Sequence, residues 1–168
     1  MKTLLATATA LALSLPALAA AHDYKLGDLE IIHPYMFETT ATAKAGGGYV
    51  TIANTGDSAD TLVSVSADFP MVQLHESFEQ DGVMRMQHVE RLEIGAGETV
   101  ELAPGGYHVM FMGLTEPFVA GTHVPVTLSF ENAGEIEVEF MVMEREGDMG
   151  HDHSGHDHSD HSDHSTQD

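Results

Sequence analysis

The 168-residue sequence has no cysteine and no tryptophan, and its six basic residues stand against 27 acidic ones. Without cysteine the protein forms no disulfide, and it lacks the thiolate that a blue-copper electron-transfer site needs. The formal net charge of −21 argues against nucleic-acid binding, because phosphate recognition needs basic patches. The charge fits a protein that attracts cations or a basic partner, and it fits equally well one that is simply kept soluble.

Long apolar runs are scarce as well, and the longest lies at the start of the chain. Lys2 and Thr3 precede LLATATALALSLPALAAA, a short apolar run closed by small residues, as in a secretory signal peptide. We predict a signal peptide over residues 1–21, cleaved after Ala19 or Ala21. The mature protein is then expected in the periplasm, with no membrane span. Cleavage after Ala21 would leave His22 at the amino terminus.

A convincing helical period is also missing. From residue 27 onward, short segments such as GGGYVTIANTGD, VPVTLSF and EIEVEFMV are rich in alternating apolar residues and end in Gly, Asn, Asp or Pro. Turn signals recur about every ten residues, as in all-β sandwiches and barrels. The sequence therefore predicts one antiparallel β-domain over residues 22–143.

Two histidines and two methionines have spacings that bring them together in such a domain. His108 and Met110 are two apart in GGYHVMFMG, which follows a Pro-Gly-Gly break and has the composition of a strand. Side chains two apart in a strand point to one face. His75 and Met86 flank EQDG, the turn of a predicted hairpin.

The tip of that hairpin has two possible positions. With Gln80-Asp81 at the tip, His75 lies directly opposite Met86; with Asp81-Gly82 at the tip, His75 faces His88 and Met86 is on the diagonal. In both registers the His75 and Met86 side chains share a face, so their pairing does not depend on the choice.

The ligand types select the metal. Thioether sulfur is a soft neutral donor and imidazole a borderline one, and together they suit Cu(I) better than Mg, Ca or Mn. Four neutral ligands also favour a monovalent ion over a divalent one. A methionine can instead simply fill a core, but the joint spacing of the four residues favours a Cu(I) site made of His75, Met86, His108 and Met110.

The spacing of these four residues resembles a known family. His75, ten residues, Met86, twenty-one residues, His108, one residue and Met110 looks like the pattern of the periplasmic copper chaperones called PCu(A)C, and GVMRM, PGGYHVMFMGL and VPVTLSFENAGEIEVEF are similar too. The similarity spans about residues 24–142. It implies a cupredoxin-like Greek-key sandwich, Cu(I) held by those four side chains, and copper delivery toward the CuA centre of cytochrome c oxidase.

Other histidines and methionines of the domain are weaker candidates for metal ligands. Met84 and Met112 each lie two residues from a candidate ligand, and they are interpreted as packing residues or reserve ligands. His33, His88 and His123 lack comparable partner spacing, so they are interpreted as surface or capped histidines, with His88 nearest to the candidate site.

The composition changes abruptly after residue 143. Residues 144–168 have almost no apolar side chain, so this segment is predicted to be disordered. Flexible imidazoles beside carboxylates can gather around Cu(II), Zn or Ni. We expect the tail to capture Cu(II), although a charged solubilising tail is the simpler alternative. Its six histidines are His151, His153, His156, His158, His161 and His164.

A copper carrier is therefore the favoured function. No Ser-His-Asp set, acid-base carboxylate pair or nucleotide loop is evident, so no enzymatic activity is expected. The expected partner is a copper acceptor such as cytochrome c oxidase subunit II or another copper assembly factor, and the protein is expected to be a monomer. The alternative is a periplasmic zinc, nickel or copper buffer that acts mainly through the tail.

Overall fold

The structure is a computed structural model that describes residues 23–145. The predicted signal peptide lies outside this part of the chain, and so do residues 146–168 of the predicted tail. The prediction that the tail is disordered therefore also falls on residues outside it. The described residues form strands joined by turns, and none of them is helical. The strands are β1 Tyr24–Leu26, β2 Leu29–Phe37, β3 Ala45–Asn54, β4 Asp60–Ser66, β5 Met71–Gln80, β6 Val83–His88, β7 Leu92–Ile94, β8 Thr99–Leu102, β9 Tyr107–Met112, β10 His123–Phe130 and β11 Gly134–Met143.

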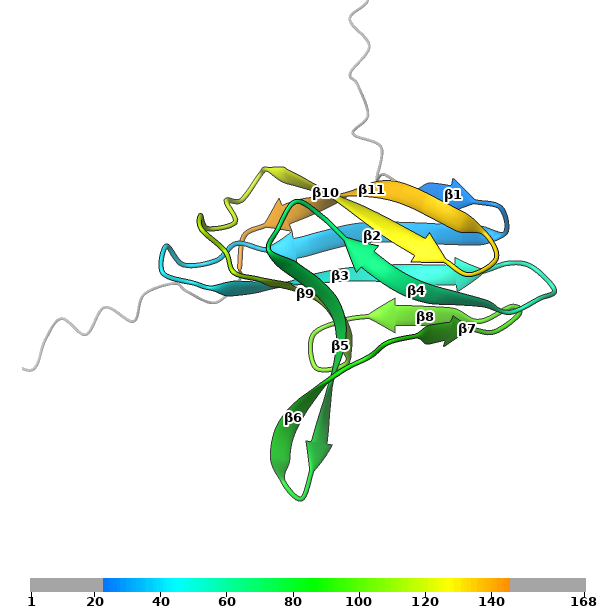
Figure 1. Ribbon diagram of the computed structural model, residues 1–168, viewed down its shortest axis with the longest axis horizontal. Coiled ribbons are helices and arrows are strands. Elements are labelled where there is room, and N and C mark those ends of the chain that lie inside the picture. The colour runs from blue at the N-terminus through cyan, green and yellow to red at the C-terminus, as the bar shows by residue number, and fades with distance from the viewer. Residues whose placement is uncertain (1–22, 146–168) are drawn as a thin grey trace, which may run out of the picture.

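These strands form one continuous sheet in the order β6-β5-β9-β3-β2-β11-β10-β4-β7, with β1 added to β2 and β8 added to β3. The all-β fold is as predicted. The sheet is mixed, because β11 pairs with β2 in parallel whereas the other pairings are antiparallel. The parallel pair brings the last strand beside an early one, so the first strand β1 and the last strand β11 both pair with β2 (Figure 1).

The sheet curves around one hydrophobic core (Figure 1). In β11 the inward residues Val138, Phe140 and Val142 are buried and the residues between them are exposed, the alternation that a strand with one covered face shows.

The turn before β11 is tied to the start of β4. Asp60 accepts hydrogen bonds from the backbone N–H groups of Thr61, Asn132 and Ala133 at 2.7, 3.0 and 2.8 Å.

The β5–β6 hairpin projects away from this core (Figure 1), and all six residues of β6 are exposed. Gln80 pairs with Val83, so Asp81 and Gly82 form the tip. Both have positive φ, 54° and 77°, as a two-residue type I′ turn requires. Of the two registers that the sequence allows, the structure therefore has the one with Asp81-Gly82 at its tip.

Candidate metal centre

The root of the hairpin brings the two candidate histidines together. In the antiparallel pair of β5 and β9, His75 lies directly opposite His108, and Gln73 lies opposite Met110. Opposed residues of an antiparallel pair project from the same face, as do residues two apart in a strand. His75, His108 and Met110 therefore share one face of the sheet. The rings of His75 and His108 are stacked with their centroids 6.1 Å apart.

The hairpin partner β6 adds Met86 to this face. His75 pairs with His88, and Ser77 pairs with Met86, so Met86 is on the diagonal from His75, at a separation that long side chains can span. All four predicted ligands thus project from one face of three neighbouring strands, β6, β5 and β9.

A cavity of about 280 Å³ opens on this face. Met86, His108 and Met110 line it, together with Ser77 and Tyr49, whereas His75 is not among its lining residues. Gly47, which pairs with Met110 across β3 and β9, also lines it, and its missing side chain makes room for the Tyr49 hydroxyl, which lies 2.9 Å from where a Cβ would be. Among the described residues around this cavity there is no carboxylate, and Arg145 carries the only full charge.

The hydrogen bonds of His108 prepare it to bind a metal. Its Nδ1 lies 3.0 Å from the carbonyl oxygen of Gly106. A carbonyl only accepts, so Nδ1 carries the proton and Nε2 keeps its lone pair. Histidines that bind metals are commonly held this way, with the other ring nitrogen donating to a backbone carbonyl. The side chain is only 6% exposed, so its orientation is fixed by packing as well.

His75 has a different environment. Its Nδ1 is buried and makes no hydrogen bond of good geometry, although the Gln73 backbone lies near enough to act on the ring as an acceptor. Burial lowers the pKa of His75, the Gln73 backbone partly opposes this shift, and the nearby His108 and His88 lower the pKa further. The imidazole therefore stays neutral to lower pH than an ordinary histidine and keeps a lone pair available for a metal.

The site has a buried side and an open side. His108 belongs to the covered part of the sheet, whereas Met86 on the projecting hairpin is 51% exposed. A metal bound here would thus be within reach of solvent or a partner from the hairpin side.

The donors on this face are soft and neutral rather than hard and charged. Across residues 23–145 no group of three or more His, Cys, Asp or Glu side chains is placed to hold a metal ion. Zn or Ca sites are usually built from such groups. What this face offers is two imidazoles and two thioethers, a neutral and soft set that fits Cu(I).

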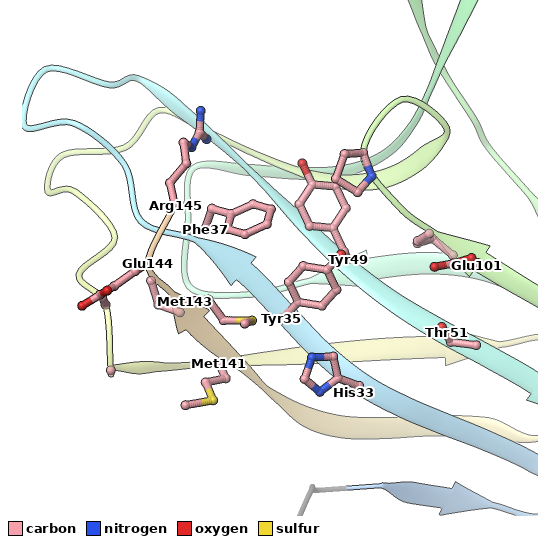
Figure 2. Close-up of a pocket in the computed structure, with 15 residues that line it drawn as sticks. His33, Tyr35, Phe37, Tyr49, Thr51, Glu101, Met141, Met143, Glu144 and Arg145 are labelled. Carbon is pink, nitrogen blue, oxygen red and sulfur yellow. The ribbon is translucent and has the colours of Figure 1, made fainter. Parts of the chain in front are cut away.

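A larger hollow lies elsewhere, on the part of the sheet formed by β2, β3 and β11. It measures about 1220 Å³, and Figure 2 shows the rings of Tyr35, Phe37 and Tyr49 grouped beside Arg145. The Arg145 guanidinium is 5.9 Å from the Phe37 ring centre. Burial raises the pKa of both tyrosines. Tyr49, Pro104 and Arg145 line both hollows. We place the candidate centre in the smaller one, because three of the four predicted ligands line it.

The other candidates fall into two groups. Met84 and Met112 share the ligand-bearing face, because they lie two residues from Met86 and Met110. His33 is on β2 and His123 on β10, away from the site, and both are exposed. The six tail histidines and His22 lie outside the described residues.

His88 faces His75 across β5 and β6, as the register with Asp81-Gly82 at the tip predicts. The Asp-Gly dipeptide, typical of type I′ tips, was the signal that pointed to this register. Sequence reasoning missed Arg145 altogether, because only folding brings the end of β11 to the cavity.

Comparison with known proteins gives the family. The model of the family described as "Putative lipoprotein LpqE-like" matches residues 29–142. The chain belongs to the LpqE-like family. Over 114 residues it is 37% identical to "Putative lipoprotein Lxx21020" of Leifsonia xyli subsp. xyli (strain CTCB07), a match that covers 64% of this chain and 69% of the relative.

Solved structures support the same fold. The copper-bound PCuAC domain from PmoF2 matches with a TM-score of 0.63 and 28% identity, covering 74% of this chain and 99% of that domain. The Cu(I) form of DR1885 from Deinococcus radiodurans matches with a TM-score of 0.54 and 25% identity, covering 74% and 83%. The LpqE-like chain therefore has a PCuAC-like fold, as the sequence resemblance implied.

The described residues contain no helix that is long and apolar enough to cross a membrane. The curated relative is described as a lipoprotein, which agrees with the expectation that this protein is exported.

Proposed function

We propose that this protein is an exported copper carrier that holds Cu(I) through His75, Met86, His108 and Met110. The strand register carries the proposal: His75 pairs directly with His108, and Met86 and Met110 project from the same face. The solved PCuAC domain from PmoF2 is copper-bound and that of DR1885 holds Cu(I), which supports the choice of metal.

Neutral ligands suit a carrier. Two imidazoles and two thioethers leave the bound ion with a single positive charge, so no acid-base residue is needed to release it. The exposed thioether of Met86 can be replaced by a partner's ligand while His108 still holds the ion. Transfer then proceeds one ligand at a time and needs no catalytic turnover.

We further propose that the acceptor is the CuA centre of cytochrome c oxidase subunit II or another copper assembly factor, and that the protein acts as a periplasmic monomer. The strong negative charge suits an acceptor with a basic docking face. In this scheme the six tail histidines capture Cu(II), so the folded domain does not need to bind it. The test is whether the Cu(I)-loaded protein passes copper stoichiometrically to the apo acceptor domain.

A Cu(I) competition titration tests the site itself. We expect His75→Ala and Met110→Ala each to lower Cu(I) affinity by at least about tenfold, since even the loss of a group that only orients a ligand has an effect of this size. His123→Ala and Met141→Ala, at exposed positions on β10 and β11, are the matched controls. Unchanged affinity in both site variants would refute the carrier proposal.

The alternative function is a zinc, nickel or copper buffer that acts through the tail, favoured by the six histidines interspersed with aspartates. It predicts that truncation after Gly147 abolishes most metal binding, Cu(I) included. The carrier proposal predicts that truncation removes Cu(II) capacity and leaves one Cu(I) per protein.

A further inference from the structure

We propose that Arg145 is a specificity-determining residue that makes the candidate metal centre select a monovalent ion. Its guanidinium charge disfavours Cu(II) and other divalent ions in the smaller cavity more strongly than it disfavours Cu(I). The inference rests on the proposed function, because it assumes that copper binds in that cavity. It adds to this function a residue outside the ligand set that decides which ion the ligands hold.

Folding places the Arg145 side chain at the cavity. Strand β11 pairs in parallel with β2, with Met143 opposite Phe37, and Arg145 follows two residues later. The guanidinium carbon lies 5.9 Å from the centre of the Phe37 ring (Figure 2), within the range of a cation–π contact. Arg145 lines the cavity together with three of the four predicted copper ligands.

No carboxylate of residues 23–145 neutralises this charge at the cavity. Neither of the ion pairs among these residues involves Arg145, and Glu38 accepts a long hydrogen bond of 3.4 Å from its backbone N–H rather than from its guanidinium. Glu101 and Glu144 line the larger hollow but not the smaller one. Sites for divalent ions usually offset the charge of the ion with carboxylates or thiolates, whereas this cavity has a cation in its wall.

The charge of Arg145 acts on the wall that the two hollows share. Tyr49 is part of that wall. Burial raises the pKa of Tyr49, and the Arg145 charge partly opposes this shift. A field that favours a negative phenolate at this wall disfavours a positive ion beside it.

The penalty grows with the charge of the ion. Coulomb energy is proportional to the product of the two charges, so Arg145 repels a divalent ion twice as strongly as a monovalent one. The factor by which it lowers divalent affinity is then the square of the factor for Cu(I). Across a cavity of about 280 Å³ that is open to solvent, one unit charge should change affinity by about threefold for a monovalent ion and about tenfold for a divalent one.

The test uses the full chain with His22 and the six tail histidines changed to Asn, so that neither end of the chain competes for Cu(II). In that background Arg145→Gln is compared with Arg145→Lys, which keeps a positive charge at the cavity. The matched control is Lys25→Gln, which removes the same charge from β1, where the side chain lines neither hollow. Thermal unfolding shows that each variant is folded.

Affinities for Cu(I) and Cu(II) are measured by competition at low salt and at about 1 M salt, where charges are screened within about 3 Å. At low salt we expect Arg145→Gln to raise Cu(I) affinity by about threefold and Cu(II) affinity by about tenfold. Both gains should shrink at high salt, and Arg145→Lys and Lys25→Gln should stay close to the parent protein.

Three results would overturn the proposal. They are equal gains for the two ions in Arg145→Gln, gains no larger than those of Lys25→Gln, and Cu(II) binding to Arg145→Gln that stays undetectable. A merely structural role for Arg145 would change both affinities alike and would not depend on salt. Failure of the proposed function is a separate result, namely unchanged Cu(I) affinity in His75→Ala.

Discussion

Strands β11 and β6 belong to the same sheet but differ in every respect that matters for function. In β11 alternate residues are fully buried in the core, whereas every residue of β6 is exposed. Phe140 has no exposed surface, and Met86 is 51% exposed. One strand contributes stability, and the other presents ligands.

The junction between these regions is the root of the hairpin. There His108 belongs to the covered sheet and His75 pairs with both His108 and His88. A buried ligand, His108, and an exposed one, Met86, thus lie at the same junction. Such an arrangement favours a site in which the buried ligand holds the metal and the exposed ligand can be exchanged for one from a partner. Substitutions in the core and in the hairpin test this difference between the two regions.

The largest expected effect on stability is in the core. Phe140→Ala should lower the free energy of unfolding by about 3–5 kcal/mol, because it leaves a cavity among packed side chains. The matched change Met84→Ala on β6, where the side chain is 60% exposed, should alter it by less than about 0.5 kcal/mol. Chemical denaturation measures both. Equal losses would show that the hairpin is as important for stability as the core.

Asp60 gives the next largest effect. Burial alone would raise the pKa of this carboxyl, but hydrogen bonds from Asn132, Thr61 and Ala133 outweigh it and hold the pKa below its ordinary value. Asp60→Asn removes a charged acceptor from these N–H groups and should lower the free energy of unfolding by about 1–3 kcal/mol.

The pH dependence of this effect has a definite sign. A carboxyl with a lowered folded pKa contributes stability above its unfolded pKa of about 3.9, and that contribution is lost as pH falls through the folded value. Wild-type stability should therefore fall more steeply than that of Asp60→Asn below about pH 4. Parallel curves from pH 5 to 2 in denaturation experiments would contradict this role for Asp60.

The hairpin tip should show a smaller effect. Gly82 has a φ of 77°, and a side chain in left-handed backbone costs about 1–2 kcal/mol. Because the hairpin is peripheral, Gly82→Ala should strain the tip locally, with a loss of about 1 kcal/mol or less in global stability. Hydrogen exchange of the β6 amides should rise, while that of β11 stays unchanged. Equal changes in both strands would mean that they unfold as one unit.

Met86→Ala should have the smallest effect on stability and a large one on binding. We expect the free energy of unfolding to change by less than about 0.5 kcal/mol, while Cu(I) affinity falls by at least about tenfold. Met84→Ala, two positions away on the same exposed strand, is the control and should leave Cu(I) affinity nearly unchanged. If Met84→Ala weakens Cu(I) as much as Met86→Ala, the ligand assignment on β6 is wrong.

Much of the fold follows from local sequence. Alternating segments such as EIEVEFMV predict the strands, and Asp81-Gly82 is a common type I′ tip. The parallel pairing of β11 with β2 was not predicted, because it joins segments about a hundred residues apart and leaves no local pattern. The same applies to Asp60, whose partners Asn132 and Ala133 are distant in the sequence.

The candidate site was predictable in part. The period of a strand places His108 and Met110 on one face, and both hairpin registers keep His75 with Met86. Periodicity alone did not decide between those registers, so the position of His88 opposite His75 became clear only from the pairing of β5 with β6. The metal bound at this face stays a prediction.

X-ray absorption on the Cu(I)-loaded protein tests the central claim most directly, because it counts the sulfur and nitrogen atoms bound to copper. We expect two sulfur and two nitrogen neighbours in the wild type, and one sulfur fewer in Met86→Ala and in Met110→Ala. A spectrum with no sulfur neighbour, or one that neither substitution changes, would contradict the assignment of copper to this face of the sheet.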